Sequence, residues 1–286
     1  MTAETDRLID CMARMKGENR PFAVATVVRT QDATSAKAGA KAVLRADGTI
    51  EGWIGGGCTQ GAVRKAAAAA LIDGRARMIR IRPADTESDG TEIAEYESKC
   101  PSGGTIDVFV DPVLPRPALL IAGASPTAQA LCDLAARAGF AVTVAALPGD
   151  LAAFTQADKR IEGFDLARDS RAAGGFVVVA TQGKRDREAL AAALATGAPY
   201  VAFVGSRKKA AALKEELAAT GAEPARLAAI RSPAGLDIGA ATPEEIAVSI
   251  LAEIVRERRL GATAIEAATA TPAEPRIAKG DSACCN

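Results

Sequence analysis

The stretch ALLIAGASPTAQALCDLAARAGFAVTVA, residues 118–145, decides the fold class. Its first five residues, 118–122, have the length and apolar character of a buried strand. Residues 129–137 are typical of a helix, which Gly139 ends, and 140–145 are again apolar. Two buried strands around one helix are the repeating unit of a parallel sheet.

The alternation of strands and helices continues beyond this stretch. The same criteria predict strands at 176–180 and 200–204 and helices at 187–194 and 208–219. Thr242 as N-cap, Pro243 at the first helical position and Glu245 three residues after the cap predict one more helix. We therefore expect a Rossmann-like parallel-sheet domain over residues 118–261. Residues 262–286 are rich in Ala, Thr, Pro and Glu and are expected to be a flexible tail.

Three prolines within 112–117 mark a linker. The order of predicted helices and strands before this linker differs from the order after it. Apolar spacing predicts helices at 5–15 and 60–72, strands at 22–28, 42–44, 49–53, 78–81 and 105–110, and an acidic, polar loop at 85–97. The predicted fold class is thus α/β, with a mixed α+β domain over 1–112 ahead of the parallel-sheet domain.

Composition narrows the chemistry. The 286 residues include 35 basic and 35 acidic side chains, 3% aromatics and no histidine, which excludes a histidine base or ligand. Balanced charge and few aromatics argue against nucleic acid as a partner. No apolar run approaches the roughly 20 residues of a membrane span, and no signal peptide is evident, so we expect a cytoplasmic protein with reduced cysteines.

The first candidate site is the glycine run Gly55, Gly56 and Gly57, followed by Cys58, ahead of the helix predicted at 60–72. Glycines let backbone N–H groups approach a ligand, and the helix start favours an anion such as phosphate. The same helix end favours the thiolate of Cys58, a ligand for a soft metal, a sulfur carrier or a nucleophile. The structural alternative is a tight turn with a buried cysteine. A second loop carries Cys100, Gly103 and Gly104; it either faces the same ligand or is an ordinary turn into a strand.

Two further candidates lie in the second domain. Gly123 and Ser125 follow its first strand, where G-x-G-x-x-G would bind a dinucleotide, but only the first glycine is in place. Gly205, Ser206 and Arg207 follow another strand and suit a phosphate or carboxylate, unless they form a solvated basic turn. The loop 233–240 is expected to bring Asp237 to the same end of the sheet.

These residues resemble the XdhC/CoxI family of molybdenum-enzyme maturation proteins. The stretches that carry the resemblance are 25–30, 38–41, 54–58 with 61–63, 205–207, 235–239 and 242–254. The resemblance implies a chaperone that binds molybdenum cofactor (molybdopterin, or its cytosine dinucleotide form) and protects it while a terminal sulfur is added. It would then pass the cofactor to an apo xanthine dehydrogenase or CO dehydrogenase. Implied partners are the large subunit of that enzyme, a sulfur donor such as a cysteine desulfurase, and a second copy in a homodimer.

The resemblance also implies site residues. The Gly55–Cys58 loop, Cys100 with its glycines, and Lys41 become the expected cofactor contacts, with Cys58 as the metal contact. The chain departs from the family at 123–128, where relatives usually show Gly-Ala-Gly-His-Val-Gly, and at Lys184, where a histidine is usual. Arginine is lost from the stretch at 33–37. These departures suggest a divergent branch similar to CoxF.

The favoured hypothesis is an accessory protein whose two domains together hold the cofactor. The sequence contains no catalytic triad, paired-carboxylate site or Walker A motif. The alternative is an oxidoreductase that binds a flavin or another nucleotide in the Rossmann-like domain. A third hypothesis is a copper or sulfur donor that acts through Cys284 and Cys285.

Overall fold

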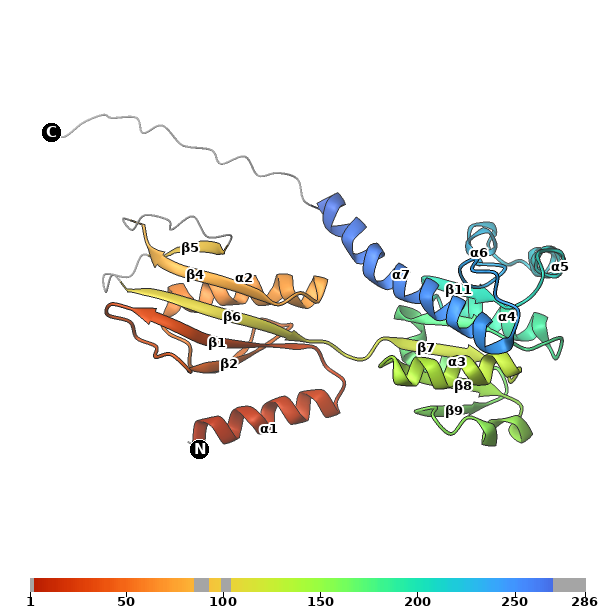
Figure 1. Ribbon diagram of the computed structural model, residues 1–286, viewed down its shortest axis with the longest axis horizontal. Helices are drawn as coiled ribbons and strands as arrows, with labels where there is room; N and C mark the ends of the chain where they lie inside the picture. The colour runs from red at the N-terminus through yellow and green to blue at the C-terminus, as the bar shows by residue number, and fades with distance from the viewer. Residues whose placement is uncertain (1–2, 85–92, 99–103, 270–286) are drawn as a thin grey trace, which may run out of the picture.

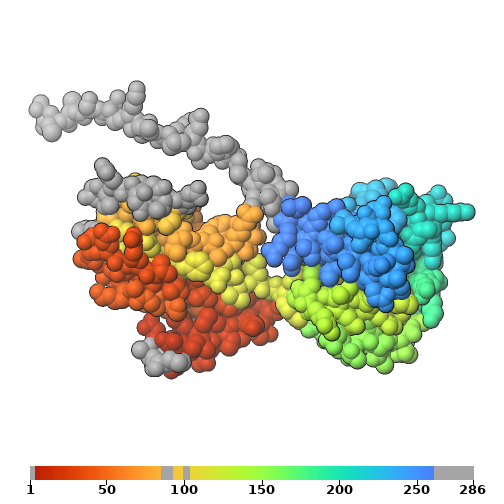
Figure 2. All heavy atoms as spheres, viewed as in Figure 1, coloured from red at the N-terminus to blue at the C-terminus, as the bar shows by residue number. Residues whose placement is uncertain are grey.

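The structure is a computed structural model that describes residues 3–84, 93–98 and 104–269. The chain forms two α/β lobes in succession, joined by residues 114–117 (Figure 1). A narrow waist separates the two lobes in the space-filling view (Figure 2). Within the described ranges, no helix has both the length and the apolar character to cross a membrane.

The N-terminal lobe is a six-stranded mixed sheet with one helix on each face. Its elements are α1 (Ala3–Gly17), β1 (Phe22–Gln31), β2 (Lys41–Arg45), β3 (Ile50–Gly52), α2 (Gly57–Asp73), β4 (Arg77–Pro83), β5 (Ala94–Ser98) and β6 (Thr105–Val113). The strand order is β3-β2-β1-β6-β4-β5, and only β4 and β5 run parallel. Along β1, Ala23, Ala25 and Val27 pack in the core under α2, whereas Phe22 packs with α1, as the two-residue period of a strand requires.

The C-terminal lobe confirms the predicted Rossmann-like parallel sheet. Its regular elements are β7 (Ala118–Ala122), α3 (Pro126–Arg137), β8 (Ala141–Ala146), β9 (Lys159–Glu162), β10 (Phe176–Val179), α4 (Asp186–Ala195), β11 (Tyr200–Phe203), α5 (Arg207–Ala219), α6 (Pro224–Ala229) and α7 (Pro243–Thr269). Short 3-10 helices lie at Pro148–Ala153, Leu166–Arg168 and Ser170–Gly174. The strand order β11-β10-β7-β8-β9 places the topological switch point between β7 and β10.

Core packing explains this layering. Leu131 of α3 and Ile250 and Ile254 of α7 are fully buried against one face of the sheet. Leu190 of α4 and Leu213 of α5 are buried in the core on the other face. The capping box at the start of α7 is confirmed: Glu245 N–H donates to Thr242 Oγ1 at 3.2 Å, and Thr242 N–H donates to Glu245 Oε2 at 3.0 Å.

Two predictions need correction, and one strand was missed. Residues 94–97 belong to β5, not to a loop, because Tyr96 packs on the core under α2 and Glu95 pairs with Arg82 at 2.8 Å. The helix α7 continues to Thr269, so the tail cannot begin at 262; the alanines that follow Gly261 favour helix. The strand β9 was not predicted, because its residues are mostly charged.

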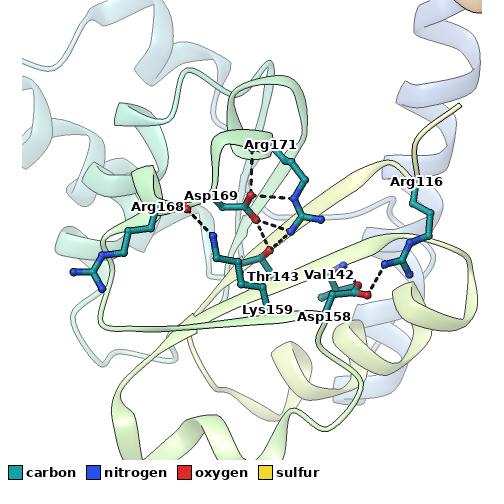
Figure 3. A network of polar contacts seen from close by, with 8 residues as sticks. All are labelled: Arg116, Val142, Thr143, Asp158, Lys159, Arg168, Asp169 and Arg171. Carbon is teal, nitrogen blue, oxygen red and sulfur yellow. Dashed lines mark hydrogen bonds and ion pairs between the residues drawn. The ribbon is translucent and has the colours of Figure 1, made fainter. Parts of the chain in front are cut away.

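A network of charged and polar side chains surrounds the amino end of β8 (Figure 3). Asp169 accepts hydrogen bonds from Arg171 and from the hydroxyl of Thr143, and Asp158 accepts one from Val142 N–H at 2.8 Å. Arg116 of the linker pairs with Asp158 and so ties the linker to this lobe. Because the network lies at the amino end of the strand, it is remote from the carboxyl ends where α/β sheets bind ligands.

Candidate functional site

A hollow of about 210 Å³ surrounds Cys58 in the N-terminal lobe. It lies on the α2 side of the sheet, where β6 begins and β4 and β5 end. Its lining residues are Thr34, Ser35, Gly56, Gly57, Cys58, Thr59, Ile81, Ser98, Gly104 and Ile106. The glycine run and the start of the second loop therefore meet in one place.

The helix α2 begins in this hollow without a side-chain cap. Gly56 is the N-cap, with extended backbone, and no side chain accepts a hydrogen bond from the first turn. The N–H of Gly56 donates to Ser35 Oγ at 3.2 Å. The helices α3 and α5 differ, because Ser125 and Ser206 cap them. Among the residues that the structure describes, none therefore caps the first N–H groups of α2, which also lack a carbonyl partner within the helix; such groups can bind water or an anion.

The structure explains the glycine at each of the three positions of the run differently. Gly55 has φ of +119°, and a Cβ there would lie 3.0 Å from Thr59 Oγ1, so the backbone itself requires glycine. A Cβ at Gly56 or Gly57 would meet no atom within 4 Å, and neither residue has a positive φ. Packing and backbone conformation therefore do not require these two glycines. Their missing side chains keep the hollow open to the backbone.

Cys58 is exposed, whereas Cys11 and Cys132 are buried. Burial raises the pKa of the Cys132 thiol to about 11, which makes it an inert packing residue. The alternative of a buried Cys58 is therefore excluded. No group of three Asp, Glu or Cys side chains within the described residues could hold a metal ion.

The second loop reaches the hollow at Gly104. A Cβ at Gly104 would lie 2.4 Å from the carbonyl oxygen of Ala33 and 2.5 Å from Thr34 Cγ2, so only glycine allows this approach. Cys100 and Gly103 lie outside the described residues. Sequence reasoning did not single out Ser35, although it lies in the stretch 33–37 that departs from the family.

Lys41 lies apart from these residues, on the opposite face of the sheet. Its neighbours on β2 alternate, with Ala42 in the core under α2 and Val43 in the core under α1. The Lys41 ammonium donates to Thr26 Oγ1 at 3.0 Å, and Lys41 lines a separate hollow beside α1 and Trp53. The structure therefore does not bring Lys41 and Cys58 together.

The loop after β7 has little hydrogen-bonding capacity left for a pyrophosphate. Gly123 N–H donates to Ala145 O at 2.8 Å, and Ser125 N–H donates to Ala180 O at 3.2 Å. Ser125 Oγ accepts from Ala128 N–H at 3.1 Å, and Pro126 has no N–H. A Cβ at Gly123 would lie 2.4 Å from Ala180 O, so this glycine serves the packing of two loops.

The loop after β10 is held by a buried carboxylate that sequence reasoning missed. Asp186 accepts from Gly183 N–H at 3.0 Å and from the Thr181 hydroxyl, and it pairs with Lys209. Burial acts to raise the pKa of Asp186, but the bonds from Lys209 and Thr181 outweigh it, so the pKa lies below its ordinary value. The signal was available in the sequence, since polar residues follow the strand directly.

Gly205, Arg207 and Asp237 meet in a larger hollow of about 550 Å³, between the start of α5 and the loop 233–240. The expected placement of Asp237 is therefore confirmed. Ser206 is the N-cap of α5, and its hydroxyl accepts from Lys209 N–H at 3.3 Å. A Cβ at Gly205 would lie 2.4 Å from the ring of Phe203, which explains this glycine without a ligand.

The two hollows lie at opposite ends of the molecule. The Cys58 hollow lies at the start of β6, the strand that ends at the linker. The larger hollow lies beyond the end of β11, which runs parallel to β7 and β10. Figure 1 shows that β6 runs toward the linker and that β7 runs away from it in the same general direction. Because one hollow lies at the start of β6 and the other beyond the end of β11, the two hollows lie at ends of the lobes that are remote from the linker. One cofactor cannot contact both hollows of one chain, which corrects the hypothesis that both domains hold it together.

The fold and these hollows define a class: two-lobed proteins with a Rossmann-like second lobe and a cysteine-bearing helix start in the first. Family models identify the family. The XdhC and CoxI family model matches residues 16–82, and the XdhC Rossmann domain model matches residues 119–254. The chain belongs to the XdhC and CoxI family.

Two proteins and one solved structure are similar to this chain. YqeB of Escherichia coli (strain K12) is 30% identical over 256 residues, which are 85% of this chain and 45% of YqeB. A probable xanthine dehydrogenase subunit of Bacillus subtilis (strain 168) is 32% identical over 164 residues, 54% of this chain and 47% of that protein. The chain thus spans less than half the length of both relatives. A crystal structure of a xanthine dehydrogenase from Bacillus halodurans, 19% identical, covers 93% of this chain and 98% of that chain with a TM-score of 0.45.

Proposed function

We propose that this protein binds molybdenum cofactor in the Cys58 hollow and delivers it to an apo-enzyme of the xanthine dehydrogenase or CO dehydrogenase type. One observation carries the proposal. The start of α2, which has no side-chain cap, places two glycines that no described residue requires next to the exposed thiol of Cys58. This arrangement suits a ligand that combines a phosphate with a soft metal.

Each part of the hollow matches one part of such a cofactor. Free N–H groups at the helix start stabilise a phosphate, and Gly56 and Gly57 let it approach the backbone. The thiolate of Cys58 is a soft ligand of the kind that molybdenum accepts. The lack of a protein ligand cluster among the described residues favours a metal that arrives within an organic cofactor over a resident ion.

The exposure of the hollow suits a carrier better than an enzyme. Cys58 is exposed, so cofactor held there is reachable by a sulfur donor, such as a cysteine desulfurase, and by the large subunit of the client enzyme. The oxidoreductase alternative has less support, because the loop after β7 uses its N–H groups within the protein. The cytosine dinucleotide form, a homodimer and a cytoplasmic location stay predictions.

A transfer assay tests the proposed function. The protein is loaded anaerobically with molybdenum cofactor and mixed with an apo xanthine dehydrogenase, and the rate of enzyme activation is measured. We expect faster activation than with the same amount of free cofactor, and loss of this advantage in Cys58→Ser. An activation rate equal to that of free cofactor would contradict delivery.

The same assay distinguishes delivery through the Cys58 hollow from the hypothesis that Cys284 and Cys285 act as the donor. A chain truncated before Ser282 lacks both thiols but keeps the Cys58 hollow. We expect it to activate the enzyme as fast as the full chain. A truncated chain that binds cofactor yet fails to activate would instead favour the tail as the donor.

A further inference from the structure

We propose that the hollow between α5 and the loop 233–240 binds a phosphorylated heteroaromatic molecule of mononucleotide size. This second ligand site does not depend on the proposed function of the Cys58 hollow. Its volume, about 550 Å³, lies within the roughly 300–1,000 Å³ of small-molecule sites.

The walls of this hollow are mostly apolar. They include Val204 after β11, Leu236 and Ile238 of the loop, and Ile246 of α7. Ile238 is 54% exposed to solvent. An exposed apolar side chain at the edge of a hollow is a feature of ligand-binding surfaces. A flat, weakly polar ring is the kind of group that such walls accommodate.

Two opposite charges complete the lining. Arg207 and Asp237 are both exposed, and neither forms an ion pair within the part of the chain that the structure describes. By contrast, the buried carboxylates of this lobe are paired: Asp186 with Lys209, Asp169 with Arg171, and Glu253 with Arg231 and Arg256. An unpaired guanidinium favours a phosphate, and an unpaired carboxylate accepts hydrogen bonds from a sugar hydroxyl or a ring amino group. A phosphorylated heteroaromatic molecule presents both.

The loop that carries Asp237 is held in place by α7. Gly235 has φ of +94°, and a Cβ there would lie 2.3 Å from Ser249 Oγ, so the loop lies directly on the helix. Gly235 N–H donates to Glu253 Oε2 at 3.0 Å, and the buried hydroxyl of Tyr200 donates to the same oxygen at 2.8 Å. The Leu236 N–H donates to Ser249 O at 3.2 Å. The hollow is therefore formed before any ligand arrives, which lowers the cost of binding.

The fold explains why the site lies near β11 and not at β7. The first-strand loop, where dinucleotides bind in related folds, has the N–H groups of Gly123 and Ser125 engaged in the protein. Residues of this loop line two hollows, of about 40 Å³ and about 270 Å³, and both are smaller than the hollow beside α5. A ligand of mononucleotide size therefore fits the second position better than the first.

Calorimetric titration of the full chain with AMP, CMP and FMN, with inorganic phosphate and adenosine as partial probes, tests this proposal. We expect saturable binding of at least one of the three phosphorylated compounds at one per chain, and weaker binding of phosphate and adenosine. Arg207→Gln and Ile238→Ser, both at exposed positions, should each raise the Kd by about tenfold or more. Lys208→Gln removes a neighbouring exposed charge that does not line the hollow, and should leave the Kd unchanged.

Two outcomes would overturn the proposal. One is the absence of saturable binding of AMP, CMP and FMN to the wild-type chain at millimolar concentration. The other is binding that Lys184→Gln abolishes and Arg207→Gln does not, because the ligand would then lie at the β7–β8 end. Cys58→Ser should bind the same compound as wild type, so failure of the cofactor proposal and failure of this one are distinguishable.

Discussion

The three cysteines in the described part of the chain differ in environment, and the difference determines what each can do. Cys11 and Cys132 pack in the cores of the two lobes. Cys58 lies in the first turn of α2 and is exposed to solvent. A glycine run ahead of a helix was enough to predict this position. The contact between Gly56 and Ser35 was not predictable, because it joins residues from two loops that only the sheet brings together.

Asp169 gives a prediction for stability at low pH. Burial acts to raise the pKa of Asp169, but hydrogen bonds from Arg171 and Thr143 outweigh it, so the folded-state pKa lies below the ordinary value of 3.8. Such a group stabilises the fold fully above its ordinary pKa, and the contribution is lost as the pH falls through the lower, folded-state pKa. We expect the free energy of unfolding to fall from about pH 4 downward, and to fall less steeply in Asp169→Asn.

Denaturant unfolding at pH 7, 4 and 3 measures this effect. Asp169→Asn should be less stable than wild type at pH 7, because the bonds to Arg171 lose their charge assistance. The matched control is Asp165→Asn, at an exposed neighbour that pairs with Arg168. Its free energy of unfolding should depend on pH as that of wild type does. If the free energy of unfolding falls equally between pH 7 and pH 3 in Asp169→Asn and wild type, Asp169 does not contribute to the loss of stability in acid.

At the scale of elements, two glycines of α2, one at its start and one in its interior, test the proposed cofactor site. Gly61 lies in the helix interior, and a Cβ there would meet no atom within 4 Å. Gly61→Ala should therefore raise the free energy of unfolding by roughly 0.5–1 kcal/mol, because alanine favours helix, and leave cofactor binding unchanged. Gly57→Ala should change stability by about 0.5 kcal/mol or less, but lower the amount of bound molybdenum, because its methyl group occupies the hollow.

Denaturant unfolding and metal analysis of both variants check this prediction. The two substitutions are chemically identical and lie one turn apart on the same helix, so each is the control for the other. If both variants bind molybdenum as wild type does, the start of α2 is not the cofactor site.

Elements were predictable where their own residues determine them. The cap and apolar spacing of α7, the glycine after α2 and the apolar strands of the parallel sheet all appear in local sequence. The strand β5 was not, since its residues Ala-Glu-Tyr-Glu-Ser resemble a polar loop until Arg82 and the core under α2 supply partners for Glu95 and Tyr96. The strand β9 also depends on its neighbour β8 for its conformation.

At the scale of the whole molecule, one candidate site lies at the start of β6 and the other beyond the end of β11, so both are remote from the linker that joins β6 to β7. The order of domains was predictable from the linker prolines and the change of pattern after it. The direction in which each site faces was not predictable from the sequence, because it depends on the direction in which β6 and β7 run on either side of the linker.

This separation predicts independent binding. Two sites without shared contacts have little coupling free energy, so one ligand should not change the affinity for the other. If CMP or another mononucleotide binds as proposed, saturating it should leave the molybdenum content of cofactor-loaded protein unchanged. Metal analysis after loading with and without the nucleotide measures this. A fall in molybdenum at saturating nucleotide would show that the two ligands compete or that the lobes are coupled.

The central claim is that cofactor binds at Cys58, and its most direct test is the molybdenum-to-protein ratio after anaerobic loading. Wild type and Cys58→Ser are incubated with molybdenum cofactor, freed of unbound cofactor, and compared by metal analysis and absorption spectroscopy. We predict close to one molybdenum per chain for wild type and a large loss in Cys58→Ser, with the same far-ultraviolet circular dichroism for both. Equal molybdenum in the two proteins, or none in wild type, would contradict the account.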